Sequence, residues 1–438
     1  MERKQQKIYI SVQTKFILSH GISFLWLLFS IWISQRWLIE LAEIVGLYVA
    51  IFIIMGIAYI PGYLNAFLVA SLLLDRQPSI RDSHPTNDVT ILIAAYNEEK
   101  VISETLKYIH DQEYAGTIKV LLIDNNSTDQ TSSVASLAAE EMGLPIKILY
   151  EPRAGKNFAL NTGLQHVDTE FVITLDADTV LHKLATRHIV ARFHSSPSEV
   201  CAVAGAVLVK NSRENLLARI QEWDYFLSIA SVKRLQGLYQ GTLVAQGAFS
   251  IYHTAAIKEV GGWSDCIGED IVLTWKFLAQ GKKVYFEPLA VAFTEVPTKL
   301  THFTRQRSRW ARGMIEGLKE VKPWQQPMPY AKYLTGTNLV MPYLDFIYTF
   351  VWLPGMILAF FGHFWIVGPM TLLVLPLTLL SYFTLYTYQK SVFQSLKLKI
   401  RENKLGFIVF VLFYQMLMSP VSVWGYVQEL FKLKRVWK

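Results

Sequence analysis

Residues 171–179 read FVITLDADT, and they predict the central strand of an α/β sheet. Apolar and β-branched residues run directly into two carboxylates, Asp176 and Asp178. A short run of this kind is typical of a buried strand. Ligands bind at the carboxyl ends of the strands in open α/β sheets, and two carboxylates one residue apart suit a hard divalent cation that also holds phosphate oxygens. A surface turn is the alternative, because Asp-x-Asp also arises by chance.

Three similar runs precede this stretch, with helix-length segments between them: VTILIAA from residue 89, IKVLLID from 118 and IKILY from 146. Asn125 to Thr128 form a turn and cap after the second run, and a helix is expected from there to about Met142. Four strands at roughly thirty-residue spacing predict a mostly parallel, Rossmann-like sheet. Neither G-x-G-x-x-G nor a P-loop follows the first strand, so NAD and ATP are not favoured.

Polar residues follow the ends of these strands and are expected to meet in one crevice: Tyr96, Glu98, Asp124, Lys156, Asp176 and Asp178. A carboxylate at the second strand can accept from a base or ribose hydroxyl, and a lysine can neutralise phosphate. Asp124 can equally serve as a helix cap.

The hydrophobic content of 52% is concentrated at both ends of the 438-residue chain, in segments 16–34, 44–74, 339–361, 364–386 and 405–430. The first, third and fourth are near the ~20 residues that cross a bilayer. The second contains Pro61 and Gly62, so a crossing that bends into an interfacial piece is expected. The first segment lacks a small-residue cleavage site and is read as a retained helix.

Basic residues predict the orientation of these segments. Arg3, Lys4, Lys7 and Lys15 place the N-terminus in the cytoplasm, and two crossings return the polar middle, from Asp75-Arg76 onward, to the same side. The loop 390–404 and the tail FKLKRVWK are also basic. A fifth full span would leave that tail outside, and Pro420 is expected to break the last segment into a re-entrant piece and an interfacial helix. The sequence is compatible with either four or five membrane spans.

The net charge of +7 comes partly from the basic residues that flank the membrane segments. It therefore favours anionic lipid surfaces over nucleic acid as binding partners. Cys201 and Cys266 both lie in the segment expected in the cytoplasm, where a disulfide is disfavoured, and they are interpreted as structural.

Seven motifs follow in order between about residues 88 and 321: AAYNEE, IDNNSTDQT, RAGKNFALNTGL, TLDADT, QGAFSIYH, Gly268-Glu269-Asp270 and QRSRW. Together they resemble the family 2 inverting glycosyltransferases of the GT-A fold. The closer resemblance is to the membrane-embedded processive branch that includes the poly-β-1,6-N-acetylglucosamine, hyaluronan and cellulose synthases. Residues 263–313 look most like the first of these.

The resemblance implies a role for each matching residue. Ala95, Tyr96 and Glu98 would line the nucleotide pocket, Asp124 would contact the base, and Lys156 would lie near the uracil or diphosphate. Asp176 and Asp178 would bind Mg²⁺ or Mn²⁺, Asp270 would be the general base, and Glu269, Gln306, Arg309 and Trp310 would close over diphosphate and acceptor. A helix N-cap is the structural alternative for Asp270. Ala94, Asn125 and Gly268 depart from the residues common in relatives.

Residues 301–321 have the spacing of an amphipathic helix independently of any family. Phe303, Trp310, Met314, Leu318 and Val321 form one face, whereas Arg305, Arg309, Arg312 and Lys319 form another. A basic amphipathic helix suits a membrane interface. An ordinary surface helix with Trp310 in the core is the alternative.

These observations predict four regions: membrane helices in 1–80, a GT-A domain in 88–298, an interface helix region in 299–335 and a membrane region in 336–438. The expected protein is a multi-pass enzyme of the cytoplasmic membrane with its catalytic domain in the cytoplasm. It would transfer sugar from a UDP-sugar, with UDP-N-acetylglucosamine as the first choice of donor, to a growing polysaccharide and extrude that polysaccharide. A small membrane accessory subunit is among the partners considered. A single-addition transferase acting on a lipid or other acceptor, a hyaluronan- or cellulose-type synthase, and a nucleotide-sugar-sensing transporter or receptor are the alternatives.

Overall fold

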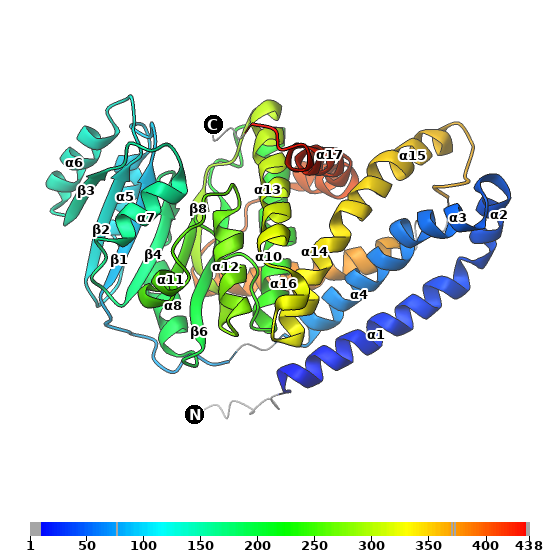
Figure 1. Cartoon of the computed structure of the whole chain (residues 1–438), viewed down its shortest axis with the longest axis horizontal. Helices are drawn as coiled ribbons and strands as arrows, with labels where there is room; N and C mark the ends of the chain where they lie inside the picture. The colour runs from blue at the N-terminus through cyan, green and yellow to red at the C-terminus, as the bar shows by residue number, and fades with distance from the viewer. Residues whose placement is uncertain (1–9, 76–77, 369–370, 372–373, 435–438) are drawn as a thin grey trace. The chain divides into compact units, whose positions relative to one another are not determined.

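The computed structural model describes residues 10–75, 78–368, 371 and 374–434. The chain divides into two compact units, shown in Figure 1. One combines Met1–Pro78 with Tyr343–Tyr388, and the other combines Ser79–Pro342 with Gln389–Lys438. The residues Arg3, Lys4, Lys7 and Arg76 that entered the orientation prediction, and the last four residues of the tail, lie outside the described residues.

The second unit is built on an eight-stranded sheet in the order β3-β2-β1-β4-β7-β6-β8-β5 (Figure 1). The strands are β1 (Val89–Ala95), β2 (Ile118–Asp124), β3 (Ile146–Tyr150), β4 (Phe171–Asp176), β5 (Thr179–Leu181), β6 (Val200–Val209), β7 (Phe249–His253) and β8 (Lys283–Thr294). The first four are parallel, as predicted. β7 runs antiparallel to β4 and β6, β8 is parallel to β6, and β5 is antiparallel to β8. The predicted α/β fold with a mostly parallel, Rossmann-like sheet is confirmed.

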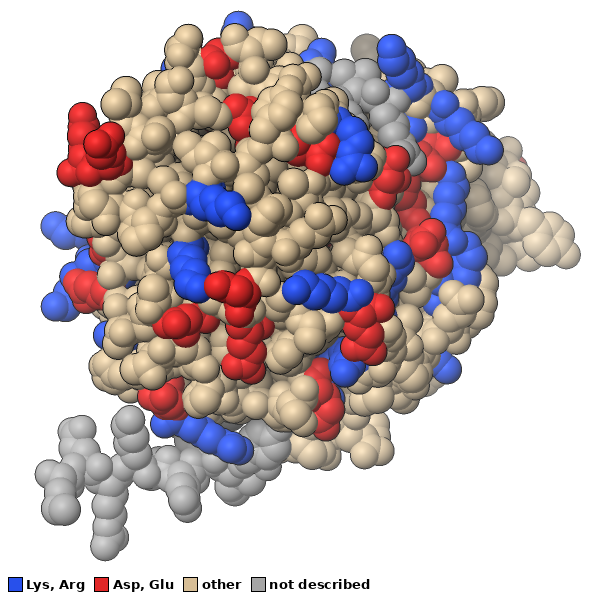
Figure 2. Space-filling model, turned by 60° about the vertical axis from the view of Figure 1, so that its left-hand side comes forward, with Lys and Arg blue, Asp and Glu red and all other residues tan. Residues whose placement is uncertain are grey.

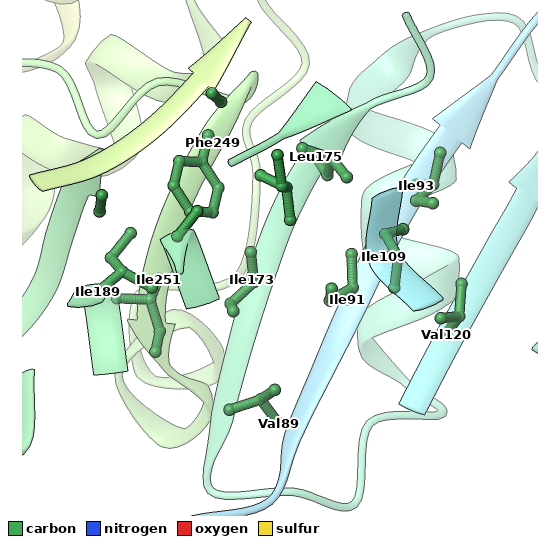
Figure 3. Close-up of a cluster of buried hydrophobic side chains, with 14 of the residues drawn as sticks. Val89, Ile91, Ile93, Ile109, Val120, Ile173, Leu175, Ile189, Phe249 and Ile251 are labelled. Atoms are coloured by element: carbon green, nitrogen blue, oxygen red, sulfur yellow. The ribbon is translucent and has the colours of Figure 1, made fainter. Parts of the chain in front are cut away.

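Helices cover both faces of the parallel half, so its central strands β1 and β4 are buried on both sides. The helices of this unit are α5 (Ile102–His110), α6 (Thr131–Met142), α7 (Lys156–Leu164), α8 (Ala185–His194), α9 (Leu216–Trp223), η2 (Asp224–Ile229), α10 (Ala230–Leu238), α11 (Thr254–Glu259), α12 (Glu269–Ala279), α13 (Leu300–Glu320), η3 (Pro323–Gln325) and α17 (Lys404–Leu430). Figure 3 shows alternate side chains of β1, β4 and β7 on one face, together with Ile109 of α5 and Ile189 of α8. Gly163 of α7 packs on the other face, against Leu92 and Ile123.

The first unit contains apolar helices from both ends of the chain. They are α1 (Val12–Ile33), α2 (Gln35–Val45), α3 (Leu47–Ile54), η1 (Met55–Tyr59), α4 (Ile60–Leu73), η4 (Tyr348–Trp352), α15 (Leu353–Phe360) and parts of α14 (Pro329–Ile347) and α16 (Val374–Ser395). Among the described residues, four helices are long and apolar enough to cross a membrane: Val12–Ile33, Leu47–Leu73, Pro329–Phe360 and Lys404–Leu430. The predicted segment 364–386 is not among them, and part of it lies outside the described residues.

One of the two predictions about prolines is wrong. The chain stays helical from Leu47 through Pro61 to Leu73, and the interfacial piece expected there stays a prediction. The π-helical turn η1 precedes Pro61, and such a turn can relieve the clash between a proline ring and the preceding helical turn. Pro420 does not break α17, which is one helix of 27 residues. Packing of α17 against α9 and α13 outweighs the cost of the internal proline.

Candidate active site

The ends of three parallel strands bring together the residues that were predicted to line the nucleotide pocket. Ala95 of β1 is opposite Asp124 of β2, and Ala94 is opposite Asp176 of β4. The polar groups after these strands therefore lie at one edge of the sheet, the edge where ligands bind in this class of fold. Ala95 itself is buried, whereas the Tyr96 side chain after it is 40% exposed.

Asp124 is held by its own loop. Its Oδ1 accepts from the N–H of Ser127 at 2.8 Å, and its Oδ2 accepts from the hydroxyl of Ser132. The N-cap of α6 is Gln130, so Asp124 fixes the loop instead of occupying the cap position. A carboxylate has about four acceptor sites. Two of them remain for a ligand, and the predicted base contact stays a prediction.

Asn125, one of the departures from the family pattern, anchors the loop that leads to Lys156. Its Nδ2 donates to the carbonyl oxygens of Glu151 at 3.1 Å and Arg153 at 2.6 Å. Its Oδ1 accepts from the N–H of Gly155 at 2.9 Å. An amide suits this position because it supplies donors and an acceptor at once, which a carboxylate cannot do.

The loop after β1 is fastened to the loop after β2. The Asn97 Oδ1 accepts from the N–H of Thr128 at 2.8 Å, and the N–H of Glu98 donates to the Thr131 Oγ1 at 2.8 Å. Asn97 has a φ of 58°, a left-handed conformation that asparagine tolerates better than most residues. These bonds place the Glu98 carboxylate near enough to Asp178 to influence its proton affinity.

Lys156 lies at the centre of the site. Its Nζ forms an ion pair with Asp176 Oδ1. It also lies against Gly247, since a Cβ built on that glycine would be 2.5 Å from Nζ. Burial opposes the charge, but Asp176, Glu269 and Asp270 outweigh it and raise the pKa of Lys156. The side chain is therefore a permanent cation between the strand edge and the start of α12.

Asp178 lies among other carboxylates. Burial, Asp176 and Glu98 raise its pKa to about 7. Its Oδ1 accepts from the hydroxyls of Thr179 at 3.3 Å and Thr294 at 3.4 Å. Within the described part of the chain, no group of three or more His, Cys, Asp or Glu side chains is arranged to hold a metal. The aspartate pair fits instead the way Mg²⁺ is commonly held, by one or two carboxylates plus substrate phosphates.

Glu269 and Asp270 form the first turn of α12 and have different surroundings. Asp270 is half-buried, and its Oδ2 accepts from the N–H of Gly247 at 3.4 Å. Glu269 is 7% exposed, and burial together with Asp270 raises its pKa to about 8. Gly268 is the N-cap residue, so neither carboxylate occupies the cap position. The more accessible carboxylate is that of Asp270.

Helix α13 is joined to α12 by backbone contact. A Cβ built on Gly268 would lie 2.7 Å from the carbonyl oxygen of Gly313 and 2.8 Å from its Cα. Glu316 Oε2 accepts from the N–H groups of Ile267 at 2.7 Å and Gly268 at 3.0 Å. Gly268 is thus required by the close approach of α13.

The predicted residues of α13 lie beside the carboxylates of α12. The positive charge of Arg309 acts on Glu269, which places the two side chains in one electrostatic neighbourhood. Gln306 is half-buried, and the Trp310 side chain is 39% exposed. Arg312 is different, because it is buried and its Nε donates to Glu429 of α17 at 2.9 Å. The basic face predicted for this helix is therefore covered by α17 at Arg312.

Arg307 was missed by sequence reasoning. It is 2% exposed, its NH2 group lies 3.0 Å from Asp224 Oδ2, and its guanidinium carbon is 4.1 Å from the centre of the Trp310 ring. Tyr414 of α17 donates to the same Asp224 oxygen at 2.6 Å. An acidic residue within the aromatic run EWDYF was the signal available in the sequence.

Lys233 of α10 was also missed. It is 8% exposed and donates to the carbonyl oxygen of Val244 at 2.7 Å. Burial lowers its pKa to about 8, against an upward influence of Asp270. No motif marks this lysine in the sequence.

Comparison with known proteins gives concordant results. Residues 85–313, more than half of the chain, match the family described as glycosyltransferase like family 2. A poly-β-1,6-N-acetyl-D-glucosamine synthase of Staphylococcus aureus (strain COL) is 30% identical over 269 residues, which cover 61% of this chain and 64% of that protein, just under two thirds of its length. The synthase of that name from Staphylococcus epidermidis is 30% identical over 307 residues, covering 67% of this chain and 74% of that protein.

A solved structure shows the same fold. A mannosyltransferase from Pyrobaculum calidifontis, in complex with GDP-Man and Mn²⁺, has a TM-score of 0.58 at 18% identity. The match covers 97% of this chain and 100% of that one.

Proposed function

The chain belongs to glycosyltransferase family 2, and we propose that it transfers a sugar from a UDP-sugar to the hydroxyl of a polysaccharide acceptor with inversion at the anomeric carbon. The observation that carries this proposal is the position of Lys156. Its ammonium group is ion-paired with Asp176 and lies against Gly247, whose N–H contacts Asp270. Metal-binding, phosphate-binding and base candidates therefore share one small site.

The proposed donor site lies at the ends of the parallel strands. Tyr96, Glu98 and Asp124 would bind the nucleoside, and Lys156 would neutralise the diphosphate. Asp176 and Asp178 would hold Mg²⁺ or Mn²⁺, which when bound supplies charge that stabilises the leaving diphosphate. Burial and the neighbouring carboxylates of Asp176 and Glu98 raise the pKa of Asp178, and this supports the assignment because a bound cation would favour the charged form of Asp178.

The reaction itself needs one base. The acceptor oxygen would form a bond to the anomeric carbon, the bond from that carbon to the diphosphate oxygen would break, and UDP would leave with the bonding electrons. Asp270 would take the proton of the acceptor hydroxyl, a contribution of ~10²- to 10⁴-fold in typical enzymes. Arg309 would add positive charge beside the diphosphate. Glu269 and Gln306 would line the acceptor, and the exposed Trp310 ring offers an apolar surface for a sugar.

UDP-N-acetylglucosamine is the proposed donor because the Staphylococcus relatives are named for poly-N-acetylglucosamine synthesis. The four apolar helices support placement in the cell membrane, with the catalytic domain in the cytoplasm and the product extruded across the bilayer. Figure 2 shows Lys and Arg side chains interspersed with Asp and Glu, which favours a small charged substrate over a nucleic acid backbone.

The test is to incubate the purified full chain separately with UDP-N-acetylglucosamine, UDP-glucose and UDP-glucuronate, and to size the products. We expect UDP release and long polymer from UDP-N-acetylglucosamine only. Products lengthened by one sugar, with a suitable acceptor, would overturn polymer synthesis and leave single addition. Polymer from another donor would overturn the proposed sugar.

A further inference from the structure

The second unit contains a cavity of about 840 Å³ beside the edge strand β5. No residue of the candidate active site lines it. Ligand pockets commonly have volumes of ~300–1,000 Å³, so the cavity is large enough for a ligand in addition to the sugar donor.

Residues 396–403, between α16 and α17, form a strap along this cavity. At one end Leu396 is buried, and the N–H of Leu398 donates to the carbonyl oxygen of Phe393 at 2.8 Å. At the other end Trp223 Nε1 donates to the carbonyl oxygen of Asn403 at 2.9 Å, and Asn403 Nδ2 donates to Glu222 Oε2 at 2.7 Å. The strap is therefore fixed at both ends, and Leu398 to Arg401 line the cavity between them.

The wall of the cavity is largely apolar and aromatic: Leu208, Trp223, Phe293, Phe393, Leu398 and Ile400. The cavity is open to solvent on one side, so water there lies against apolar surface, and covering that surface with an apolar ligand is favourable. A hydrocarbon chain is suited to that space.

Most charged groups that line the cavity already have partners. Lys183 is 2.5 Å from Glu113, Lys210 is 2.5 Å from Glu104, and Glu222 is 2.9 Å from Arg213. Lys399 and Arg401 are exposed, and within the described part of the chain neither has an acidic partner. Two cations thus stand at the mouth of an apolar cavity.

We propose that this cavity binds an acyl chain of an anionic phospholipid, with the headgroup phosphate held by Lys399 and Arg401. The charge pattern fits, since a lysine and an arginine together favour a phosphate and a guanidinium can bind it through two hydrogen bonds. Position supports a bilayer lipid, because α17, one of the four helices apolar enough to cross a membrane, begins at Lys404, three residues beyond Arg401. The proposal does not depend on the sugar chemistry.

The experiment measures lipid binding to the purified full chain in neutral detergent, by native mass spectrometry and by displacement of a fluorescent acyl probe. The probes are phosphatidylglycerol and phosphatidylcholine with identical chains, and palmitate. The variant K399E/R401E reverses the mouth charge, and L398W fills the cavity. The matched control R81E/K147E changes two exposed cations that do not line the cavity.

We expect phosphatidylglycerol to bind at least tenfold more tightly than phosphatidylcholine, because each cation near an anionic lipid favours binding. K399E/R401E should lose this preference, L398W should displace the acyl probe, and the control should behave as wild type. Equal binding of the two phospholipids, or retention of the preference in K399E/R401E, would overturn the proposal. Palmitate binding as tightly as phosphatidylglycerol would assign the cavity to a free fatty acid instead. Probe binding unchanged in L398W would place the lipid elsewhere.

Discussion

The two halves of the candidate site are held in different ways. On the strand-edge side, Asp124, Asn125 and Asn97 are fixed by hydrogen bonds to neighbouring loops at most about thirty residues away. On the helical side, Arg307 is fixed by Asp224, and α13 is fixed by a glycine contact with α12 and by Glu429 of α17. The side chains at the strand edge are therefore held in place by neighbouring turns, whereas those on the helical side are held by residues distant in sequence.

The largest expected effect is at the meeting point of the two halves. Replacing Asp270 by Asn keeps its size and removes the proton acceptor. Sugar transfer should fall by ~10²- to 10⁴-fold with near-native UDP affinity. Measuring UDP release and UDP binding on the same preparation distinguishes a loss of sugar transfer from a loss of UDP affinity. The control is D265N, an exposed residue of the preceding turn. Near-native turnover would move the base to Glu269.

The strand-edge half is tested by D178N. Losing one carboxylate of the proposed cation site should reduce metal-dependent UDP release by roughly 10²-fold and weaken UDP binding. D168N is the control, because Asp168 lies before the same strand in an exposed pair with Lys119. Activity titrated against Mn²⁺ and Mg²⁺ is the measurement. An unchanged metal requirement in D178N would remove the aspartate from the site.

The helical half is tested by R307K, which keeps the charge but removes the planar group that stacks on Trp310. We expect roughly tenfold slower sugar transfer with unchanged UDP binding, since acceptor-side geometry is disturbed and small misplacements are costly. R305K, on an exposed position of the same helix, should behave as wild type. If UDP affinity fell instead, Arg307 would act on the donor side.

The α12–α13 contact is tested by G268A. A methyl group would lie 2.7 Å from the Gly313 carbonyl oxygen, so the free energy of unfolding should fall by about 1–3 kcal/mol. Gly336, in a helix with no atom within 4 Å of a built Cβ, provides the control G336A. Thermal unfolding of both variants is compared with wild type. Equal stability of the two would mean that the helices separate easily.

The last prediction concerns the pH dependence of stability. The pKa of Glu269 is raised from 4.5 to about 8, so the folded state binds the proton of this carboxyl more tightly than the unfolded state does. The contribution of Glu269 to the free energy of unfolding is complete below pH 4.5. It falls as the pH rises from 4.5 to about 8, and it is lost above about pH 8. Wild type should lose thermal stability between pH 5 and 8 more steeply than E269Q, with the exposed-site variant E259Q as control. Parallel curves for wild type and E269Q would contradict the raised pKa.

This contrast explains what could be predicted from the sequence. The four parallel strands and the polar residues after them follow from local periodicity, so Asp124, Lys156 and Asp176 were placed correctly at one edge. The antiparallel strands and the Asp224–Arg307 pair depend on contacts between distant segments, which periodicity does not reveal. The Pro420 prediction was wrong for the same reason, because tertiary packing of α17 overrides the local preference of proline.

The contact between Gly268 and Gly313 has a consequence for motion during turnover. Two helices whose backbones touch, and whose turn is fastened by Glu316, cannot slide past each other without separating. The carboxylate of Asp270 and the Gln306 to Trp310 segment must then travel as one rigid body. Opening of the site for substrate exchange would then involve the loops after β1, β2 and β3, which are joined to one another by side-chain to backbone hydrogen bonds and not by contact between backbones.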